Sequence, residues 1–238
     1  MQDWGRNSEK VAQVSRRGVL ASGLALSSLA VLPGCATMGS AASDTNFTAV
    51  IRRLLDLSTQ RAFASLTADG GFWNSAVARV DMPTLFGKSS GAFKGVLSSK
   101  PFRETLQRQL NTFAEDGARR AAPVVAEAVR NISIPDAYAV LRSEEPTAAT
   151  TLLRSAMGPA LVNAMIPELD EAMRAADNPI ISQALSALSG VNVDDAAKAL
   201  ALEADNAIWY QIGAEESKIR QNPASTNDPL LIGALKLL

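Results

Sequence analysis

Two adjacent glutamates late in the chain are the residues best suited to acid–base or metal chemistry. Glu216 is four residues before Arg220, and Glu215 is three before Lys218. At these spacings, helical side chains can pair on the surface. A second interpretation brings a third acid, Asp136, close to both glutamates. Three carboxylates could then hold a divalent cation through oxygen atoms, or serve a carboxylate-dependent hydrolase.

The segment Thr147-Ala148-Ala149-Thr150 is a second candidate binding site. It places hydroxyl groups and backbone amides at the start of an expected helix, where the helix dipole favours anions. Thr147 as an ordinary N-cap is one interpretation. An anion or a lipid head group bound between Thr147 and Thr150, close to Arg142 and Arg154, is the other.

Aromatic side chains offer a third candidate site. Trp209 and Tyr210 lie together late in the chain, and Phe72 and Trp73 lie in an early loop. They would either pack in the core or line an apolar pocket. In the second case the four-residue glycine spacing of a helix expected over 83–98 would provide an adaptable wall.

Composition excludes several kinds of chemistry. The chain has no histidine and one cysteine, and it lacks the phosphate-binding and dinucleotide-binding glycine patterns. We therefore expect no metal site built on His or Cys and no cofactor. Removing residues 1–34 takes away four basic and two acidic residues, which leaves 19 basic and 22 acidic residues. This balance gives no basic field for nucleic acid.

The first 44 residues predict a cellular location. Arg16 and Arg17 lie in Ser-Arg-Arg-Gly-Val-Leu, which resembles a twin-arginine export signal, and Leu-Pro-Gly before Cys35 resembles a lipoprotein cleavage site. We expect 1–34 to be a cleaved signal peptide and 35–44 a tether, lipidated at Cys35, that anchors the protein in a membrane. An ordinary secretory signal with an incidental cysteine is the alternative. The lipoprotein interpretation places the chain on the periplasmic side of the cell envelope, with the outer membrane favoured because Ala36 is not aspartate.

Residues 45–238 are predicted to form one all-α domain of about eight helices, several of them kinked at proline or glycine. Apolar residues recur at helical spacing, and no credible strand alternation occurs. The expected helices span 45–68 with Asp44 as cap, 83–98, 100–131 with a kink or division at Gly117 and Pro123, 136–143, 147–176 bent near Pro159 and Pro167, 178–190, 193–221 and 228–238, and 70–82 is expected to be a loop.

Several motifs together resemble a known family. Ile134-Pro135-Asp136-Ala137-Tyr138 is followed by Thr147-Ala148-Ala149-Thr150, and later by Glu215-Glu216-Ser217-Lys218-Ile219-Arg220-Gln221-Asn222-Pro223. They resemble an uncharacterised bacterial exported family, catalogued as domain of unknown function 4197, over roughly residues 50–238. The resemblance implies an all-helical envelope protein and brings no activity. The candidate binding residues are Asp136, Thr147, Thr150, Trp209, Glu215, Glu216, Arg220 and Asn222.

These observations favour a non-enzymatic binding domain for an apolar ligand or an envelope partner. An envelope assembly or scaffold protein without a ligand pocket is one alternative, and a carboxylate-dependent hydrolase or divalent-cation-binding protein is the other. An apolar cavity above about 300 Å³ would favour ligand binding. An exposed apolar patch would favour a protein partner, and clustered acids in a cleft would favour the hydrolase.

Overall fold

The fold is described from a computed structural model of the chain. The structure describes residues 38–81, 99–175 and 192–237, together with Pro179, Ser182 and Ala184. For residues 38–45 it describes the backbone alone. All of these belong to the second of the chain's two compact units, Thr37–Leu238. The export signal at Arg16 and Arg17, the lipidation site at Cys35 and the helix expected over 83–98 lie outside the described residues, as does most of 178–190.

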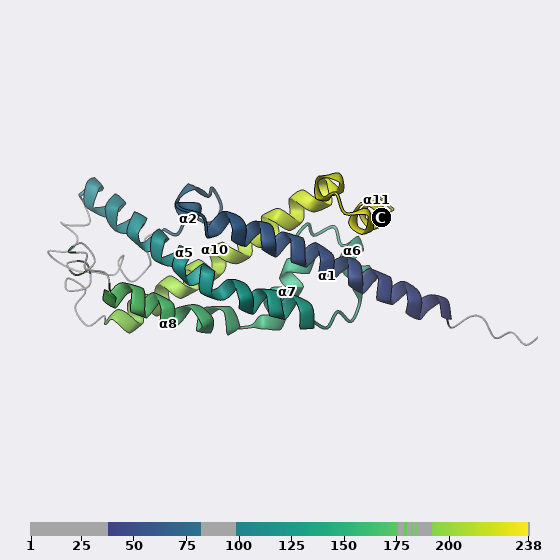
Figure 1. Cartoon of the computed structure of the whole chain (residues 1–238), viewed down its shortest axis with the longest axis horizontal. Helices are drawn as coiled ribbons and strands as arrows, with labels where there is room; N and C mark the ends of the chain where they lie inside the picture. Colours follow the sequence, from purple (N-terminus) through teal and green to yellow (C-terminus); the bar gives the residue numbers. More distant parts are fainter. Residues whose placement is uncertain are drawn as a thin grey trace, which may run out of the picture. The chain divides into compact units, whose positions relative to one another are not determined.

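The described part of the chain contains helices and no strand, which confirms the all-α prediction (Figure 1). The elements are α1 Met38–Leu66, α2 Gly71–Asn74, α5 Lys100–Asn131, α6 Ala137–Arg142, α7 Ala148–Met157, α8 Ala160–Ala175, α10 Val193–Gln221, a 3-10 helix Pro223–Thr226, and α11 Pro229–Lys236.

Long helices build the core. α8 packs against both α5 and α10, and α1 packs against α5 and α10. The apolar residues of α8 recur at four-residue spacing and are fully buried, as Leu161, Met165 and Leu169 show. Each such side chain contributes about 1.5–3 kcal/mol through burial. Gly117 lets α5 approach α8 closely, because a Cβ there would lie 3.2 Å from Leu169 Cδ2.

Local signals predicted most helix starts correctly. Asp136 caps α6 by accepting a hydrogen bond from the Ala139 amide at 2.9 Å, and Asn192 caps α10 through the Asp195 amide at 2.8 Å. Asp228 accepts hydrogen bonds from the first amides of α11. These side chains satisfy amides that have no partner inside their own helix.

Two long helices, α1 and α5, differ from the prediction. α1 begins at Met38, so Asp44 lies inside it rather than at its N-cap, and residues 38–44 of the expected tether are helical. α5 is not divided at Gly117 or Pro123 but continues to Asn131. Pro123 is exposed, and buried Ala121 and Val125 flank it, so core packing holds the helix together on both sides of the missing amide.

The helix expected over 147–176 is divided in two. α7 ends at Met157, and Gly158 has a φ of 52°, a positive value that glycine adopts easily. Pro159 follows without an amide hydrogen to continue the ladder, so α8 begins at Ala160. Pro167 lies inside α8 without ending it.

The segment expected as a loop over 70–82 contains the short helix α2. Its Phe72 is completely buried, which explains why this connection is so apolar. A Cβ on Gly71 would clash with the carbonyls of Ser65 and Leu66, where α1 ends. Glu115 of α5 is buried, and the Gly70 and Phe72 amides at the start of α2 act to lower the pKa of its carboxyl.

The buried Glu115 carboxyl predicts a pH-dependent stability. Burial raises its pKa above the ordinary 4.5, and the backbone amides of Gly70 and Phe72 oppose that shift. The folded chain therefore binds this proton more tightly than the unfolded chain. This contribution to stability is present below about pH 4.5 and is lost as the pH rises through the raised pKa. Glu115→Gln keeps an oxygen acceptor and removes the charge. As the pH increases from about 4 to about 7, its free energy of unfolding should therefore increase relative to that of wild type.

Urea unfolding at both pH values measures this difference, with Glu127→Gln, an exposed position on the same helix, as the control. An equal change in stability for the two variants would contradict the prediction.

Candidate functional site

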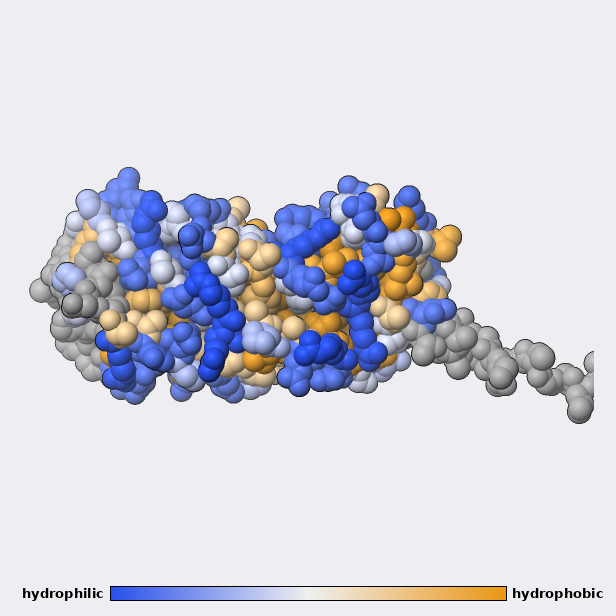
Figure 2. All heavy atoms as spheres, viewed as in Figure 1, coloured by the Kyte–Doolittle hydropathy of each residue, from blue (hydrophilic) through white to orange (hydrophobic). Residues whose placement is uncertain are grey.

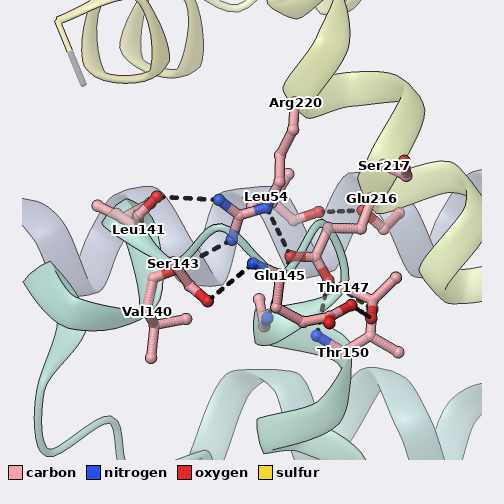
Figure 3. Close-up of polar contacts among 12 residues, drawn as sticks. Leu54, Val140, Leu141, Ser143, Glu145, Thr147, Thr150, Glu216, Ser217 and Arg220 are labelled. Carbon is pink, nitrogen blue, oxygen red and sulfur yellow. Dashed lines mark hydrogen bonds and ion pairs between the residues drawn. The ribbon is translucent and has the colours of Figure 1, made fainter.

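Glu216 on α10 is a buried carboxylate that caps a neighbouring helix. Its side chain is 0% exposed. It accepts hydrogen bonds from the Ala149 amide at 3.1 Å, the Thr150 amide at 2.7 Å and the Thr150 hydroxyl at 2.7 Å (Figure 3). These groups form the first turn of α7, whose own N-cap residue, Thr147, makes no side-chain cap. The glutamate thus satisfies the free amides of α7 and places negative charge at the positive end of its dipole.

Arg220 lies one turn further along α10 and binds both Glu216 and a second helix. Its Nε donates to Glu216 Oε1 at 2.8 Å. Its Nη1 and Nη2 donate to the carbonyls of Leu141 and Val140 at 3.0 and 3.2 Å (Figure 3). Those carbonyls belong to the last turn of α6, where the helix dipole favours a cation. Consecutive turns of α10 therefore hold the end of α6 and the start of α7.

The connection between α6 and α7 is folded through local hydrogen bonds. Ser143 Oγ accepts from the Glu145 amide at 3.1 Å, and the Thr147 hydroxyl donates to Glu145 at 2.8 Å. The methyl group of Thr147 then packs on the bare face of Gly213, where a Cβ would lie 3.0 Å from it. Glycine at this position lets the start of α7 approach α10 closely.

These contacts change the interpretation of two sequence candidates. Glu216 and Arg220 do pair, but the pair is buried rather than on the helix surface. The α7 start from Thr147 to Thr150 does bind an anion, and that anion is a carboxylate of the same chain rather than an external ligand.

The other candidate acids have separate structural partners. Glu215 pairs with Lys218 at 2.7 Å, as its spacing predicted, and accepts a hydrogen bond from Gln211, which Ser75 also contacts at 3.1 Å. Asp136 caps α6. Within the described ranges, no group of three His, Cys, Asp or Glu side chains could hold a metal ion. Asn222 is exposed, follows the last residue of α10 as its C-cap, and donates its backbone amide to the Lys218 carbonyl.

Trp209 belongs to a polar group that sequence reasoning missed. Its side chain is buried, and its Nε1 donates to Asp205 Oδ1 at 2.9 Å. Asp205 Oδ2 accepts from Arg154 Nη2 at 3.2 Å, and Arg154 also donates to Asn206 at 2.6 Å. Burial raises the pKa of Asp205, and the hydrogen bonds from Trp209 and Arg154 oppose that shift. The four-residue spacing of Asp205 and Trp209 was the available signal.

A cleft of about 520 Å³ lies along α10, between α7 and the segment that follows α2. It is open to solvent rather than closed. Val77 and Tyr210 are 50% and 65% exposed, although both are apolar or aromatic. The lining residues are Val77, Thr147, Thr150, Thr151, Arg154, Trp209, Tyr210, Gly213, Ala214 and Ser217.

The fold and this site define an all-helical domain in which a buried carboxylate caps a neighbouring helix and an open cleft runs beside the capped helix. The family model described as "Protein of unknown function (DUF4197)" matches residues 41–234, and the chain belongs to this family. The resemblance expected from the motifs is thereby confirmed. No curated protein and no solved structure matches the chain. Among the described helices, none is long and apolar enough to cross a bilayer.

Removing Glu216 should destabilise the fold strongly. Glu216→Ala leaves Arg220 without its carboxylate and frees two buried amides, so we expect a loss of about 3–5 kcal/mol in the free energy of unfolding. Lys218→Ala breaks the neighbouring pair, in which the lysine side chain is 64% exposed, and should cost less than about 1 kcal/mol. Urea unfolding measures both.

The double variant Glu216→Gln/Arg220→Met provides a further control for the pair, because it leaves neither buried charge alone. It should lose less stability than the sum of its two single changes. A loss for Glu216→Ala no greater than that for Lys218→Ala would show that the buried pair is not important for stability.

Gly213→Ala should destabilise through contact with Thr147, although alanine is intrinsically the better helix residue by about 1 kcal/mol. Thr147→Ser removes the contacting methyl group, so Gly213→Ala should cost less in that background. Gly233→Ala on α11, with no atom within 4 Å of the new Cβ, serves as the control and should be neutral or stabilising. Thermal unfolding of the four variants measures these effects, and equal shifts for Gly213→Ala in both backgrounds would refute the contact.

Proposed function

We propose that this chain is a non-enzymatic binding domain of the cell envelope, which takes an apolar or amphipathic small molecule into the cleft along α10. The observation that carries the proposal is exposed apolar surface inside a concave site. Tyr210 is 65% exposed beside Trp209, which is 3% exposed and forms part of the lining. A ligand that covered Tyr210 and Val77 would remove that surface from water.

The dimensions and chemistry of the cleft support a small-molecule ligand. A volume of about 520 Å³ falls in the range of about 300–1,000 Å³ that is typical of ligand pockets. Its walls are mainly apolar, and the polar groups among them are the hydroxyls of the threonines, Tyr210 and Ser217 and the guanidinium of Arg154. Apolar walls with a few polar groups are the usual composition of such pockets.

The proposed location depends on the N-terminal sequence. Arg16 and Arg17 would direct export, residues 1–34 would be removed, and Cys35 would carry the acyl chains that anchor the domain on the periplasmic side of the envelope. Each buried CH₂ of such a chain contributes about 0.8 kcal/mol to membrane attachment. The outer membrane remains the favoured destination.

The carboxylate-dependent alternative has little support from the contacts. Glu216 caps α7, Asp136 caps α6 and Glu215 pairs with Lys218, so each acid already has a structural partner. A catalytic acid or base would have to leave these partners before it reached a substrate.

An envelope assembly or scaffold protein is the second candidate function, and one surface favours it. Leu230 and Leu237, on and just after α11, are 45% and 88% exposed. Figure 2 shows hydrophobic residues gathered at the end of the described domain where Figure 1 places α11. Exposed apolar residues of this kind are common at protein–protein contacts.

Native mass spectrometry of the Cys35→Ser chain, which cannot be acylated, tests ligand binding. We expect a co-purifying mass that organic extraction removes and that returns when envelope lipids are added. Ala214→Phe should abolish it by filling the cleft, whereas Ala64→Phe, at an exposed position on α1, should not. A chain that carries no extra mass and gains none from envelope lipids would overturn the proposal and favour the scaffold function.

A further inference from the structure

Arg154 gives the cleft one charged end. α7 runs antiparallel to α10, since Thr147 lies against Gly213 and Arg154 lies against Asp205 and Asn206. The α10 residues that line the cleft run from Trp209 to Ser217, over which the helix rises about 12 Å. Arg154 is the only charged side chain among the described residues that line it.

The guanidinium of Arg154 is held in place and still has free donors. In the described part of the chain, its hydrogen bonds to Asp205 and Asn206 both use Nη2. A guanidinium has five N–H donors, so Nε and Nη1 keep theirs for another acceptor. The Arg154 side chain is 42% exposed, whereas that of Asp205 is 12% exposed. Asp205 and Asn206 therefore hold the guanidinium at Nη2, while much of the Arg154 side chain stays accessible to solvent.

The carboxylate of Asp205 partly offsets the positive charge of Arg154, but it leaves hydrogen-bond donors of the guanidinium available for a ligand. Its two carboxylate oxygens accept hydrogen bonds from Trp209 and from Arg154, and its side chain is largely buried. A second carboxylate, arriving from solvent, could accept a charge-assisted hydrogen bond from Nη1 or from Nε, the donors that these two contacts leave free.

The rest of the cleft is suited to a hydrocarbon chain. From Arg154, the ligand would pass over Trp209 and Tyr210 toward Ala214 and Val77. Val77 and Ala214 also line a second cleft of about 470 Å³, whose lining includes the polar side chains of Asp69, Asn74, Gln211 and Lys218. The apolar stretch therefore ends where these polar side chains begin, and this limits the length of a bound chain.

We propose that the ligand of this cleft is an amphipathic molecule with one carboxylate head group on a hydrocarbon chain, and that Arg154 binds the head group. This inference rests on the proposed function, because it names the ligand class of the same cleft. Arg154 determines the head group, and the aromatic and aliphatic wall binds the chain.

Three probes with the same chain and different head groups test the inference: decanoate, decanol and decylamine. Trp4→Phe/Trp73→Phe in the full chain leaves Trp209 as the single tryptophan, so its fluorescence reports on the cleft. We expect decanoate to bind about tenfold more tightly than decanol, since a hydrogen bond to a charged group contributes about 1.5–3 kcal/mol. Decylamine should bind most weakly because its cation meets Arg154.

Arg154→Gln should reduce the affinity for decanoate about tenfold, to that of decanol, and leave the affinity for decanol unchanged. Arg154→Gln/Asp205→Asn gives the same test without an unpaired buried carboxylate, in case the single variant does not fold. Arg142→Gln, an exposed arginine of α6 outside the cleft, is the matched control and should keep the preference for decanoate.

Equal binding of decanoate and decanol, or a preference for decanoate that survives both Arg154 variants, would overturn the carboxylate head group while leaving the binding function intact. Binding of decylamine above decanoate would also overturn it. If none of the three probes bound, the proposed function would fail together with this inference.

Discussion

The buried ion pair between Glu216 and Arg220 is the constraint on which the rest of the structure depends. The two residues lie one turn apart on α10, yet each holds a different helix: Glu216 the start of α7 and Arg220 the end of α6. Both charges are removed from water, which is unfavourable unless every donor and acceptor finds a partner. The dipoles of α6 and α7 and the pairing of the two side chains together supply those partners. This arrangement fixes α7 on α10 and so defines one wall of the cleft.

Buried acids serve the same structural purpose elsewhere in the domain. Glu115 of α5 is buried, and the Gly70 and Phe72 amides at the start of the short helix α2 act on its carboxyl. Asp205 joins the indole of Trp209 to the guanidinium of Arg154. Glu216 satisfies donors of another helix and Asp205 those of two cleft residues, and burial keeps these hydrogen bonds away from competing water. The polar core of this chain is thus a set of links between helices.

The same links prepare the proposed binding site. Glu216 positions α7 on one side of the cleft. On the other side, Ser75 contacts Gln211, which also reaches Glu215 and ties the segment after α2 to α10. A cleft whose walls are fixed before the ligand arrives loses less conformational entropy on binding. This is a physical reason for placing an open apolar cleft next to the buried hydrogen bonds of Glu216.

The sequence alone determined what depends on neighbouring residues. Helical periodicity gave the all-α class, and Asp136, Asn192 and Asp228 marked helix starts because a cap bonds amides two or three residues away. Only the tertiary structure distinguished Glu216, buried against α7, from its neighbour Glu215, because spacing shows which residues share a helix face and not what packs on that face. The contacts of Glu216 with Thr150 and of Arg154 with Asp205 join residues 66 and 51 positions apart, so no local pattern contains them.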